Sequence, residues 1–193
     1  MGRLITHYFN PYTVGKLKKK RITEIVIDLM NISAQTSPKS SGNFLETMVL
    51  DEAEKEMLAE ELYQLSDEFM DETYSEEGDL VNSSDEILII GLKNHPSLGI
   101  DCKACGYESC KDFSEAEQTE QIFKGPNCVF RLLDLGMSIG HALNTAETHN
   151  IDYKISIKGG LAAKNLGLMD SRVCLTVPIQ VISDKDYHNV RLL

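Results

Sequence analysis

Four of the five cysteines of this chain fall in one short stretch, and this clustering constrains the fold more than any other feature of its 193 residues. Cys102, Cys105 and Cys110 form a C-x2-C-x4-C pattern, and Cys128 follows within the segment GPNC. Four thiolates can hold a [4Fe-4S] cluster with one thiolate per iron, and a compact three-cysteine loop with a remote fourth ligand is a usual arrangement. We therefore predict that these four cysteines bind one [4Fe-4S] cluster.

Zinc is the main alternative to iron as the metal that the four thiols would bind. Structural zinc sites usually arrange their ligands as two separated pairs, and a single remote fourth cysteine fits that habit less well. Gly106 follows the second cysteine, where a residue without a side chain lets backbone amides point at cluster sulfurs. The fifth cysteine, Cys174, stands alone in the apolar run VCLTVPIQV and is expected to be a small buried hydrophobe.

Hydrophobic periodicity predicts helices and strands that alternate along the chain. The predicted helices cover 22–35, 51–78, 128–149 and 157–166, and the predicted strands cover 44–50, 86–92 and 173–181. The strand 86–92, EILIIGL, is apolar throughout, which is typical of a strand buried on both faces at the centre of a sheet. Gly136 and Gly140 should weaken the long third helix unless something packs close to its backbone.

These elements predict a single α+β domain over residues 1–193, with a mixed central sheet flanked by helices. Residues 99–128 are expected to be an inserted cluster-binding segment of the ferredoxin type, and residues 1–16 an N-terminal arm. Arg131, three residues after Cys128, is expected to form a helix-surface salt bridge, with a phosphate contact as the alternative.

The charge of the chain limits its partners. The formal net charge is −11, and acidic residues concentrate between Asp51 and Asp79. Such a surface repels phosphate backbones, so nucleic-acid binding is not expected, whereas a basic redox partner protein could dock there.

No stretch approaches the length of about 18 apolar residues that spans a membrane, and the start lacks a secretory pattern, so we expect a cytoplasmic protein.

Two resemblances extend this interpretation. CKACGYESCKDF followed by GPNC resembles the four-cysteine motif of small [4Fe-4S] domains in corrinoid iron-sulfur proteins and in ferredoxin-like subunits of electron-transport complexes. From about Ile25 to Pro178, the chain resembles a family of uncharacterised microbial proteins described as containing a ferredoxin domain. Its end, QVISDKDYHNVRLL, departs from the usual tail of that family. The matching pieces are TSPKSSGN, ILIIGLK, DCKACGYESC, GPNCVFRLLDLGMSIGHAL and GLAAKNLGL.

The second resemblance is to flavin-dependent nitroreductases, which implies a nitroreductase-like fold and a bound FMN. It rests on a basic helix start before an Ala-x-x-Ser-Pro-like loop, and on an alanine-rich helix before a strand. The matching residues are Ala34, Ser37, Pro38 and Lys39 in the loop, and Ala162, Ala163 and Gly167 in the later helix.

The sequence as a whole predicts an iron-sulfur redox protein, an oxidoreductase if it is an enzyme, whose cluster relays electrons to a flavin in the same protein. The alternative is a noncatalytic binding or redox-sensing module in which a cluster or zinc braces a loop. A redox partner protein is expected, and a homodimer is a further option. No catalytic residue can be assigned, because the chain has no P-loop, nucleophile triad or dinucleotide fingerprint.

Overall fold

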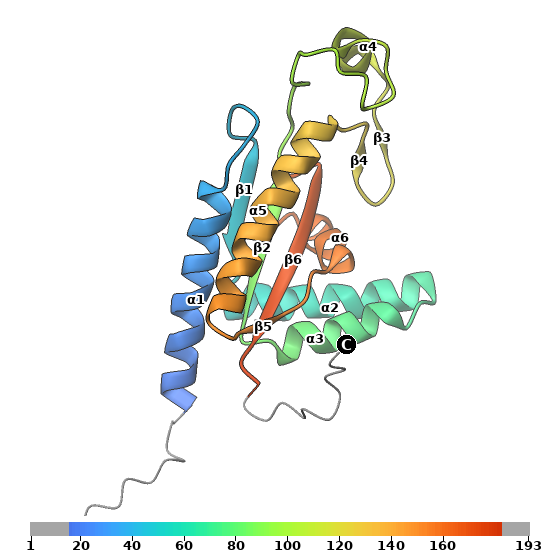
Figure 1. The fold of residues 1–193 in the computed structure, drawn as a ribbon. Helices are drawn as coiled ribbons and strands as arrows, with labels where there is room; N and C mark the ends of the chain where they lie inside the picture. Colours follow the sequence, from blue (N-terminus) through green and yellow to red (C-terminus); the bar gives the residue numbers. More distant parts are fainter. Residues whose placement is uncertain (1–15, 183–193) are drawn as a thin grey trace, which may run out of the picture.

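Four strands form the central sheet of the computed structural model, which describes residues 16–182, with side chains from Lys20 onward (Figure 1). Their order is β1 (Leu45–Val49), β2 (Glu86–Leu92), β6 (Val173–Gln180) and β5 (Asp152–Tyr153). All residues of β2 after the first are buried, since helices cover both of its faces. The prediction that 86–92 is a central strand is confirmed.

The strand pairings of the described residues are all antiparallel, so the sheet is not mixed in direction as predicted. Between β1 and β2 the chain passes through α2 (Glu52–Phe69) and α3 (Thr73–Ser83). These two helices run out and back, which returns the chain to the edge where β1 ends and makes β2 antiparallel to it (Figure 1). The α+β class, with a sheet flanked by helices, is confirmed.

Residues 51–78 form parts of two helices and not one helix as predicted. A capping box at Asp51 starts α2. The Asp51 side chain accepts from Glu54 N at 2.8 Å, and the Glu54 side chain accepts from Asp51 N at 2.9 Å. The helix ends at Met70, which is left-handed with φ 52°. Gly78 lies inside α3 and does not end it, because its bare backbone packs on Tyr63, whose ring would meet an added Cβ at 2.8 Å.

The two faces of the sheet bury separate cores. On one face, α1 (Lys16–Thr36) and α5 (Val129–Thr148) lie side by side, and α6 (Ile157–Asn165) covers the other face with α2 and α3 (Figure 1). Alternate residues of β2 point to opposite faces. Leu88 and Ile90 therefore join the core under α1 and α5, and Ile87 joins the core under α2, α3 and α6.

The first helix carries two apolar stripes. Val26 and Met30 are buried against the sheet. Ile22, Ile25 and Leu29 follow the same helical spacing in the sequence but are 49%, 51% and 40% exposed. The periodicity of 22–35 thus predicts the helix correctly, whereas it does not separate the inward stripe from the outward one.

The chain between β2 and α5 projects beyond one end of the sheet (Figure 1). It contains the short helix α4 (Cys110–Glu115) and a small hairpin of β3 (Thr119–Glu120) and β4 (Lys124–Gly125). The predicted cluster-binding segment 99–128 lies in this projection. Residues 1–15 of the predicted N-terminal arm and the divergent tail from residue 183 lie outside the described residues.

Two further expectations concern α5 and membranes. An added Cβ at Gly136 or Gly140 would meet no atom within 4 Å outside the helix's own backbone, so within the described residues nothing packs close enough to offset the expected weakening of α5. In the part of the chain that the structure describes, no helix combines the length and the apolar character that a membrane crossing needs.

Candidate functional site

The four clustered cysteines differ in burial. Cys102 is exposed, Cys105 and Cys110 are half-buried, and Cys128 is only 5% exposed. Cys110 opens α4, and its backbone N–H donates to Asp101 Oδ1 at 2.6 Å. Cys128 is the extended residue directly before α5, so a long helix packed on the sheet holds it in place.

The chain around the first two cysteines turns sharply. Asp101, Lys103 and Gly106 have left-handed backbones, with φ of 46°, 58° and 87°. Gly106 N donates to Lys103 O at 2.9 Å, which closes a tight turn around Cys105. Glycine adopts this conformation without steric cost. The turn therefore explains a glycine at position 106, in addition to the predicted approach of backbone amides to cluster sulfurs.

The structure does not gather the four thiols. Within residues 16–182, no three His, Cys, Asp or Glu side chains are grouped so that they could hold a metal ion. The donor chemistry fits an iron-sulfur cluster, since soft thiolates select such clusters, but the arrangement does not. The ligand set Cys102, Cys105, Cys110 and Cys128 therefore stays a prediction.

Cys174 is set apart from this segment. It is fully buried in β6, and its thiol donates to Gly160 O at 3.1 Å. Burial raises the pKa of the Cys174 thiol to about 11, so the group stays protonated at neutral pH. The prediction that Cys174 is a small buried hydrophobe is confirmed.

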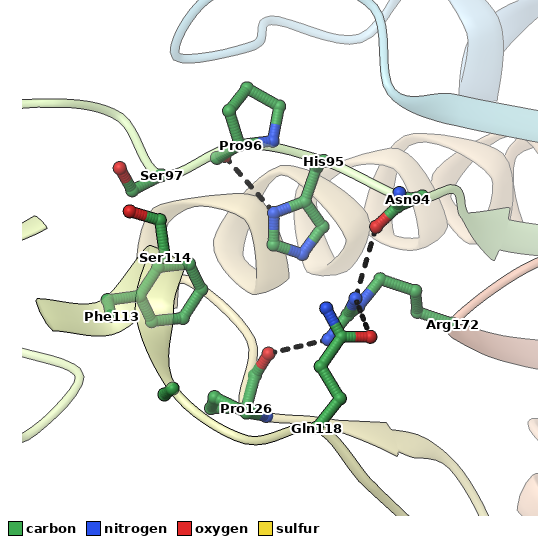
Figure 2. Close-up of a pocket in the computed structure, with 10 residues that line it drawn as sticks. Asn94, His95, Pro96, Ser97, Phe113, Ser114, Gln118, Pro126 and Arg172 are labelled. Atoms are coloured by element: carbon green, nitrogen blue, oxygen red, sulfur yellow. Dashed lines mark hydrogen bonds between the residues drawn. The ribbon is translucent and has the colours of Figure 1, made fainter. Parts of the chain in front are cut away.

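A buried arginine connects the projection to the sheet. Arg172 directly precedes β6, and its guanidinium donates four hydrogen bonds to the projecting chain. Figure 2 shows those to Asn94, Gln118 and Pro126. The acceptors are Asn127 Oδ1 at 2.9 Å, Asn94 Oδ1 at 3.1 Å, Gln118 Oε1 at 3.3 Å and Pro126 O at 2.8 Å. One side chain thus holds three separate pieces of the projection, including the two residues that precede Cys128.

His95 extends this network. Its Nε2 lies 3.2 Å from Asn127 Oδ1, and its Nδ1 lies 3.2 Å from Pro96 O. Asn127 Nδ2 donates to Lys124 O at 2.6 Å, which turns Oδ1 of the amide toward both His95 and Arg172. Burial lowers the pKa of His95, although its hydrogen bonds oppose the effect, so the ring is neutral at pH 7.

A cavity of about 270 Å³ opens between this network and α4 (Figure 2). Polar groups of the loop after β2 line one side, and the Phe113 ring lies across from them. The lining residues are Asn94, His95, Pro96, Ser97, Phe113, Ser114, Ala116, Gln118, Pro126 and Arg172.

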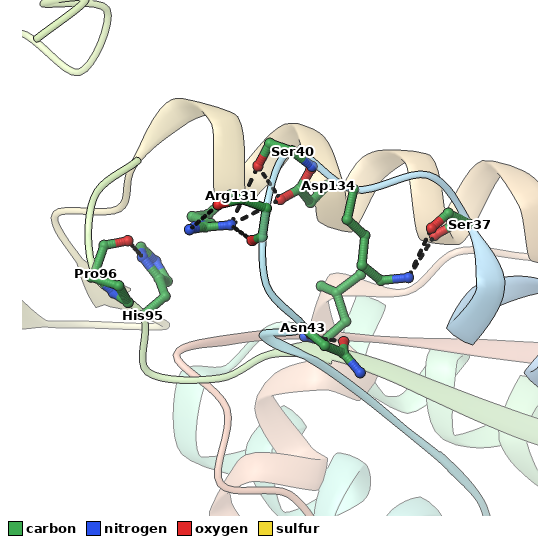
Figure 3. Close-up of polar contacts among 10 residues, drawn as sticks. Ser37, Ser40, Asn43, His95, Pro96, Arg131 and Asp134 are labelled. Atoms are coloured by element: carbon green, nitrogen blue, oxygen red, sulfur yellow. Dashed lines mark hydrogen bonds and ion pairs between the residues drawn. The ribbon is translucent and has the colours of Figure 1, made fainter. Parts of the chain in front are cut away.

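A second buried arginine lies where the loop after α1 meets α5 (Figure 3). Ser40 N and Ser40 Oγ donate to the two carboxylate oxygens of Asp134, each at 2.7 Å. Arg131 Nη1 lies 3.5 Å from Asp134 and also donates to Ser41 O. Arg131 is 3% exposed and stacks over the Phe44 ring at 4.5 Å. The prediction of a helix-surface salt bridge at Arg131 is wrong, because the loop folds over the pair.

The residues of the predicted flavin motif lie in two places. Lys39 Nζ donates to Gln35 O at 2.6 Å and to Ser37 O at 2.8 Å, which satisfies carbonyls at the end of α1. Ala34 is buried in the core under α1 and α5, whereas Ala162 and Ala163 are buried in the opposite core. The structure does not bring the two halves of the motif together.

No pattern in the sequence predicted the Arg172 network. Asn94, His95, Asn127 and Arg172 are single polar residues in loops, and none of them forms a spaced motif. The available signal was an arginine placed directly before a buried apolar strand, a position where a charge needs partners.

The chain has relatives among known proteins. A family described as "uncharacterized protein containing a ferredoxin domain" matches residues 124–189, a range that includes Cys128 but not the other three clustered cysteines. An uncharacterised protein of Archaeoglobus fulgidus is 35% identical over 170 residues, which covers 88% of this chain and 92% of the relative.

Solved structures share the fold. A BluB-like flavoprotein from Clostridium difficile 630 superposes with a TM-score of 0.54 at 11% identity, over 88% of this chain and 91% of that one. NfrA1 of B. megaterium superposes with a TM-score of 0.50 at 17% identity, over 84% of this chain and 60% of NfrA1. The chain thus spans about three fifths of the length of NfrA1. A nitroreductase family protein from Clostridium novyi NT gives 0.50 at 13% identity, over 83% and 76%. The nitroreductase-like fold is confirmed.

Proposed function

The chain belongs to the family of uncharacterised proteins containing a ferredoxin domain, and on this premise we propose that it is an iron-sulfur redox protein with one [4Fe-4S] cluster. The observation that carries the proposal is the set of four thiols in the segment around α4, with the fourth at the start of α5. Cys102, Cys105, Cys110 and Cys128 would be the ligands. Such a cluster supplies one-electron transfer.

The projecting segment would have to change its conformation to bind the cluster. Cys128 is buried beside the sheet, whereas Cys102 is exposed. Because the described residues hold no group of three metal-binding side chains, loading would require residues 99–110 to move so that their cysteines gather with Cys128. Few core residues hold this stretch, since Phe113 is its nearest buried apolar side chain along the sequence. We place this chemistry in the cytoplasm, where thiols stay reduced.

Anaerobic purification followed by iron and sulfide analysis tests the proposal. About four irons and four sulfides per chain are expected, together with the EPR signal of a reduced cluster. Stoichiometric zinc without sulfide would contradict it and would favour the noncatalytic module with a structural metal. A preparation with iron that cannot be reduced would favour the binding or sensing alternative.

FMN binding is a second candidate, favoured by one specific observation at the loop after α1. Arg131 is buried there, and among the described residues its Nε has no hydrogen-bond partner. Ser40 and Ser41 place hydroxyls beside the same guanidinium at 3.3 Å. Such a site suits the phosphate of FMN, which arginine and hydroxyl groups bind well.

Release of a flavin on denaturation tests this second candidate. The released compound should comigrate with FMN on chromatography, and Arg131→Gln should abolish retention while Lys39→Gln weakens it less. If purified wild-type protein neither carries nor takes up FMN, the flavin candidate is wrong, and the oxidoreductase proposal then rests on the cluster alone.

We also propose that two copies pair through the outward stripe of α1. This stripe comprises Ile22, Ile25, Leu29 and Ile32, whose side chains are between 40% and 56% exposed. Their spacing of three and four residues is that of a helix seam that pairs with another helix. Because a two-fold interface uses the same surface of both copies, a self-complementary apolar stripe suits it.

The acidic surface of α2 is the proposed docking face for a redox partner protein. Its exposed carboxylates include Glu56, Glu60 and Glu68, and a basic partner would be steered toward them. Association that weakens strongly with added salt is the expected behaviour, and a salt-independent association would contradict it.

A further inference from the structure

The cavity beside Arg172 differs in charge from the rest of the protein. The chain has a formal net charge of −11, yet none of the residues that line this cavity is acidic. Arg172 is the one lysine or arginine among them, and His95 is neutral at pH 7 because burial lowers its pKa. The cavity therefore has a positive wall in a negatively charged molecule.

The positive charge of Arg172 is not balanced by any of its hydrogen-bond acceptors. Arg172 is 6% exposed. Its four acceptors are the side-chain amide oxygens of Asn94, Gln118 and Asn127 and the backbone carbonyl of Pro126. Buried charges in proteins are normally paired with an opposite charge, because moving an unpaired ion out of water is unfavourable. The arrangement therefore leaves a place for an anion.

Glu120, whose charge acts on Arg172, is already engaged with lysine side chains. Glu120 acts on Arg172 through space only, and its oxygens contact Lys164 and, at 3.8 Å, Lys124. A guanidinium has five N–H groups, and the four bonds to the protein leave one group on Nη2 for a ligand. A ligand oxygen could accept from it without displacing the protein contacts.

A smaller cavity on another side of Arg172 behaves differently. It measures about 190 Å³ and is lined by Asp170 and Lys124 as well as Arg172. Asp170 and Lys124 offset each other in charge, so the two cavities have the same net charge. The larger cavity suits an organic anion better, because it has apolar walls, more room and no carboxylate that would compete for Arg172.

The walls and the volume of the larger cavity restrict its ligand. Phe113, Pro96 and Pro126 present apolar surface, and Ser97 and Ser114 present hydroxyls (Figure 2). A volume of about 270 Å³ equals that of roughly nine water molecules at about 30 Å³ each. A short organic acid fits this space, with its carboxylate on the guanidinium and its carbon chain against the rings.

We infer that this cavity binds a small organic carboxylate, with Arg172 as the partner of its carboxylate group. The ligand would lie between α4 and the segment that leads to Cys128, which makes it a substrate or effector of the chemistry in that segment. The binding itself does not depend on the proposed cluster, because Arg172, Asn94 and Gln118 are in place without it.

Titration calorimetry of the purified full chain tests the inference. The probes are propionate, succinate and inorganic phosphate at constant ionic strength, with chloride as the blank. At least one carboxylate should bind with a stoichiometry of one, and more tightly than phosphate. The iron content of each sample is measured, and binding should be the same in iron-loaded and iron-free protein, so failure of the cluster proposal leaves this result unaffected.

Three variants locate the site. Arg172→Gln removes the charge and should weaken carboxylate binding at least tenfold. Ser114→Trp fills the cavity from exposed helix α4 and leaves every hydrogen bond of Arg172 intact, so it should abolish binding even if Arg172→Gln fails to fold. Lys124→Gln removes a charge from the smaller cavity only, and should bind within twofold of the wild type.

The inference is overturned if no carboxylate binds more tightly than chloride, or if Ser114→Trp binds as the wild type does. Phosphate bound more tightly than either carboxylate would also overturn it, because the organic body of the ligand would then contribute nothing. A loss of binding in Lys124→Gln equal to that in Ser114→Trp would also overturn it, because the anion would then bind in the smaller cavity.

Discussion

The Nε–H of Arg172 donates a hydrogen bond to Asn127 Oδ1 at 2.9 Å, and Asn127 is the residue directly before Cys128. The residue that precedes β6 therefore holds the segment that leads into a predicted cluster ligand. Backbone bonds strengthen the same connection, because Arg172 N donates to Leu92 O at 2.8 Å and Lys124 N donates to Arg172 O at 3.0 Å. The position of Cys128 thus depends on a contact between distant parts of the chain.

Replacing Asn127 tests this connection. Asn127→Ala removes the acceptor of Arg172 Nε and the donor to Lys124 O, so we expect a loss of about 1–3 kcal/mol in the free energy of unfolding, measured with urea. Asn165→Ala is the matched control, since its amide bonds Glu61 at the surface, and should change stability by less than about 0.5 kcal/mol. Equal effects of the two substitutions would show that the buried network contributes little.

The cluster ligands can be separated from the structural cysteine. Cys128→Ala should lower the iron and sulfide content of the anaerobic protein far more than Cys174→Ala, because the Cys174 thiol lies in β6 and bonds Gly160. The measurement is chemical iron and sulfide analysis with the EPR spectrum. Similar losses in both variants would refute the assignment of Cys128 as a ligand.

The buried pair of Arg131 and Asp134 should be sensitive to removal of one partner. Asp134→Ala leaves the arginine without its carboxylate and Ser40 without its acceptor, and we expect a loss of about 3–5 kcal/mol in the free energy of unfolding. Glu115→Ala is the control, since it removes an exposed ion pair with Lys111, which typically contributes less than about 1 kcal/mol. A small effect at Asp134 would mean that water reaches Arg131.

The outward stripe of α1 should control association. Ile25→Glu places a charge in the proposed two-fold interface, so we expect a dimer in the wild type and a monomer in the variant by sedimentation or light scattering. Met57→Glu on α2 is the control, because Met57 is 46% exposed and Ile25 is 51% exposed. A wild-type protein that is monomeric at micromolar concentration would contradict the pairing.

Gly160 is expected to tolerate no side chain. An added Cβ there would lie 2.0 Å from the carbonyl oxygen of Cys174, a backbone atom of β6 that cannot turn away. Gly160→Ala should therefore lower stability by several kcal/mol, about 3 or more by analogy with overpacked cores, or prevent folding. Gly140→Ala meets no atom within 4 Å and gains helix propensity, so thermal unfolding should be unchanged or shifted upward. A stable Gly160→Ala protein would mean that α6 can move off β6.

Several elements of the fold could be predicted because their signals are local. The apolar run 86–92 is short and bounded by polar turns, which predicts a buried strand, and the apolar spacing after Cys128 predicts a long helix. The division of 51–78 into two helices was not predictable, because the break falls at Met70, a left-handed residue that is not glycine. Gly78, the expected helix end, is held inside α3 by its contact with Tyr63 on another helix. The direction of the sheet likewise followed from how α2 and α3 return the chain.

The site divides in the same way. The clustering of the thiols is visible in the sequence alone, because Cys102, Cys105, Cys110 and Cys128 lie within one short stretch of chain. Tertiary contacts set the burial of Arg131 and Cys128, the exposure of Cys102, and the cavity without acidic residues that Arg172 lines. These outcomes depend on contacts between residues 45 to 94 positions apart, such as Arg172 with Asn127 and Ser40 with Asp134. Local pattern carries periodicity and spacing, whereas burial and charge balance are set by whichever distant side chains the fold brings alongside.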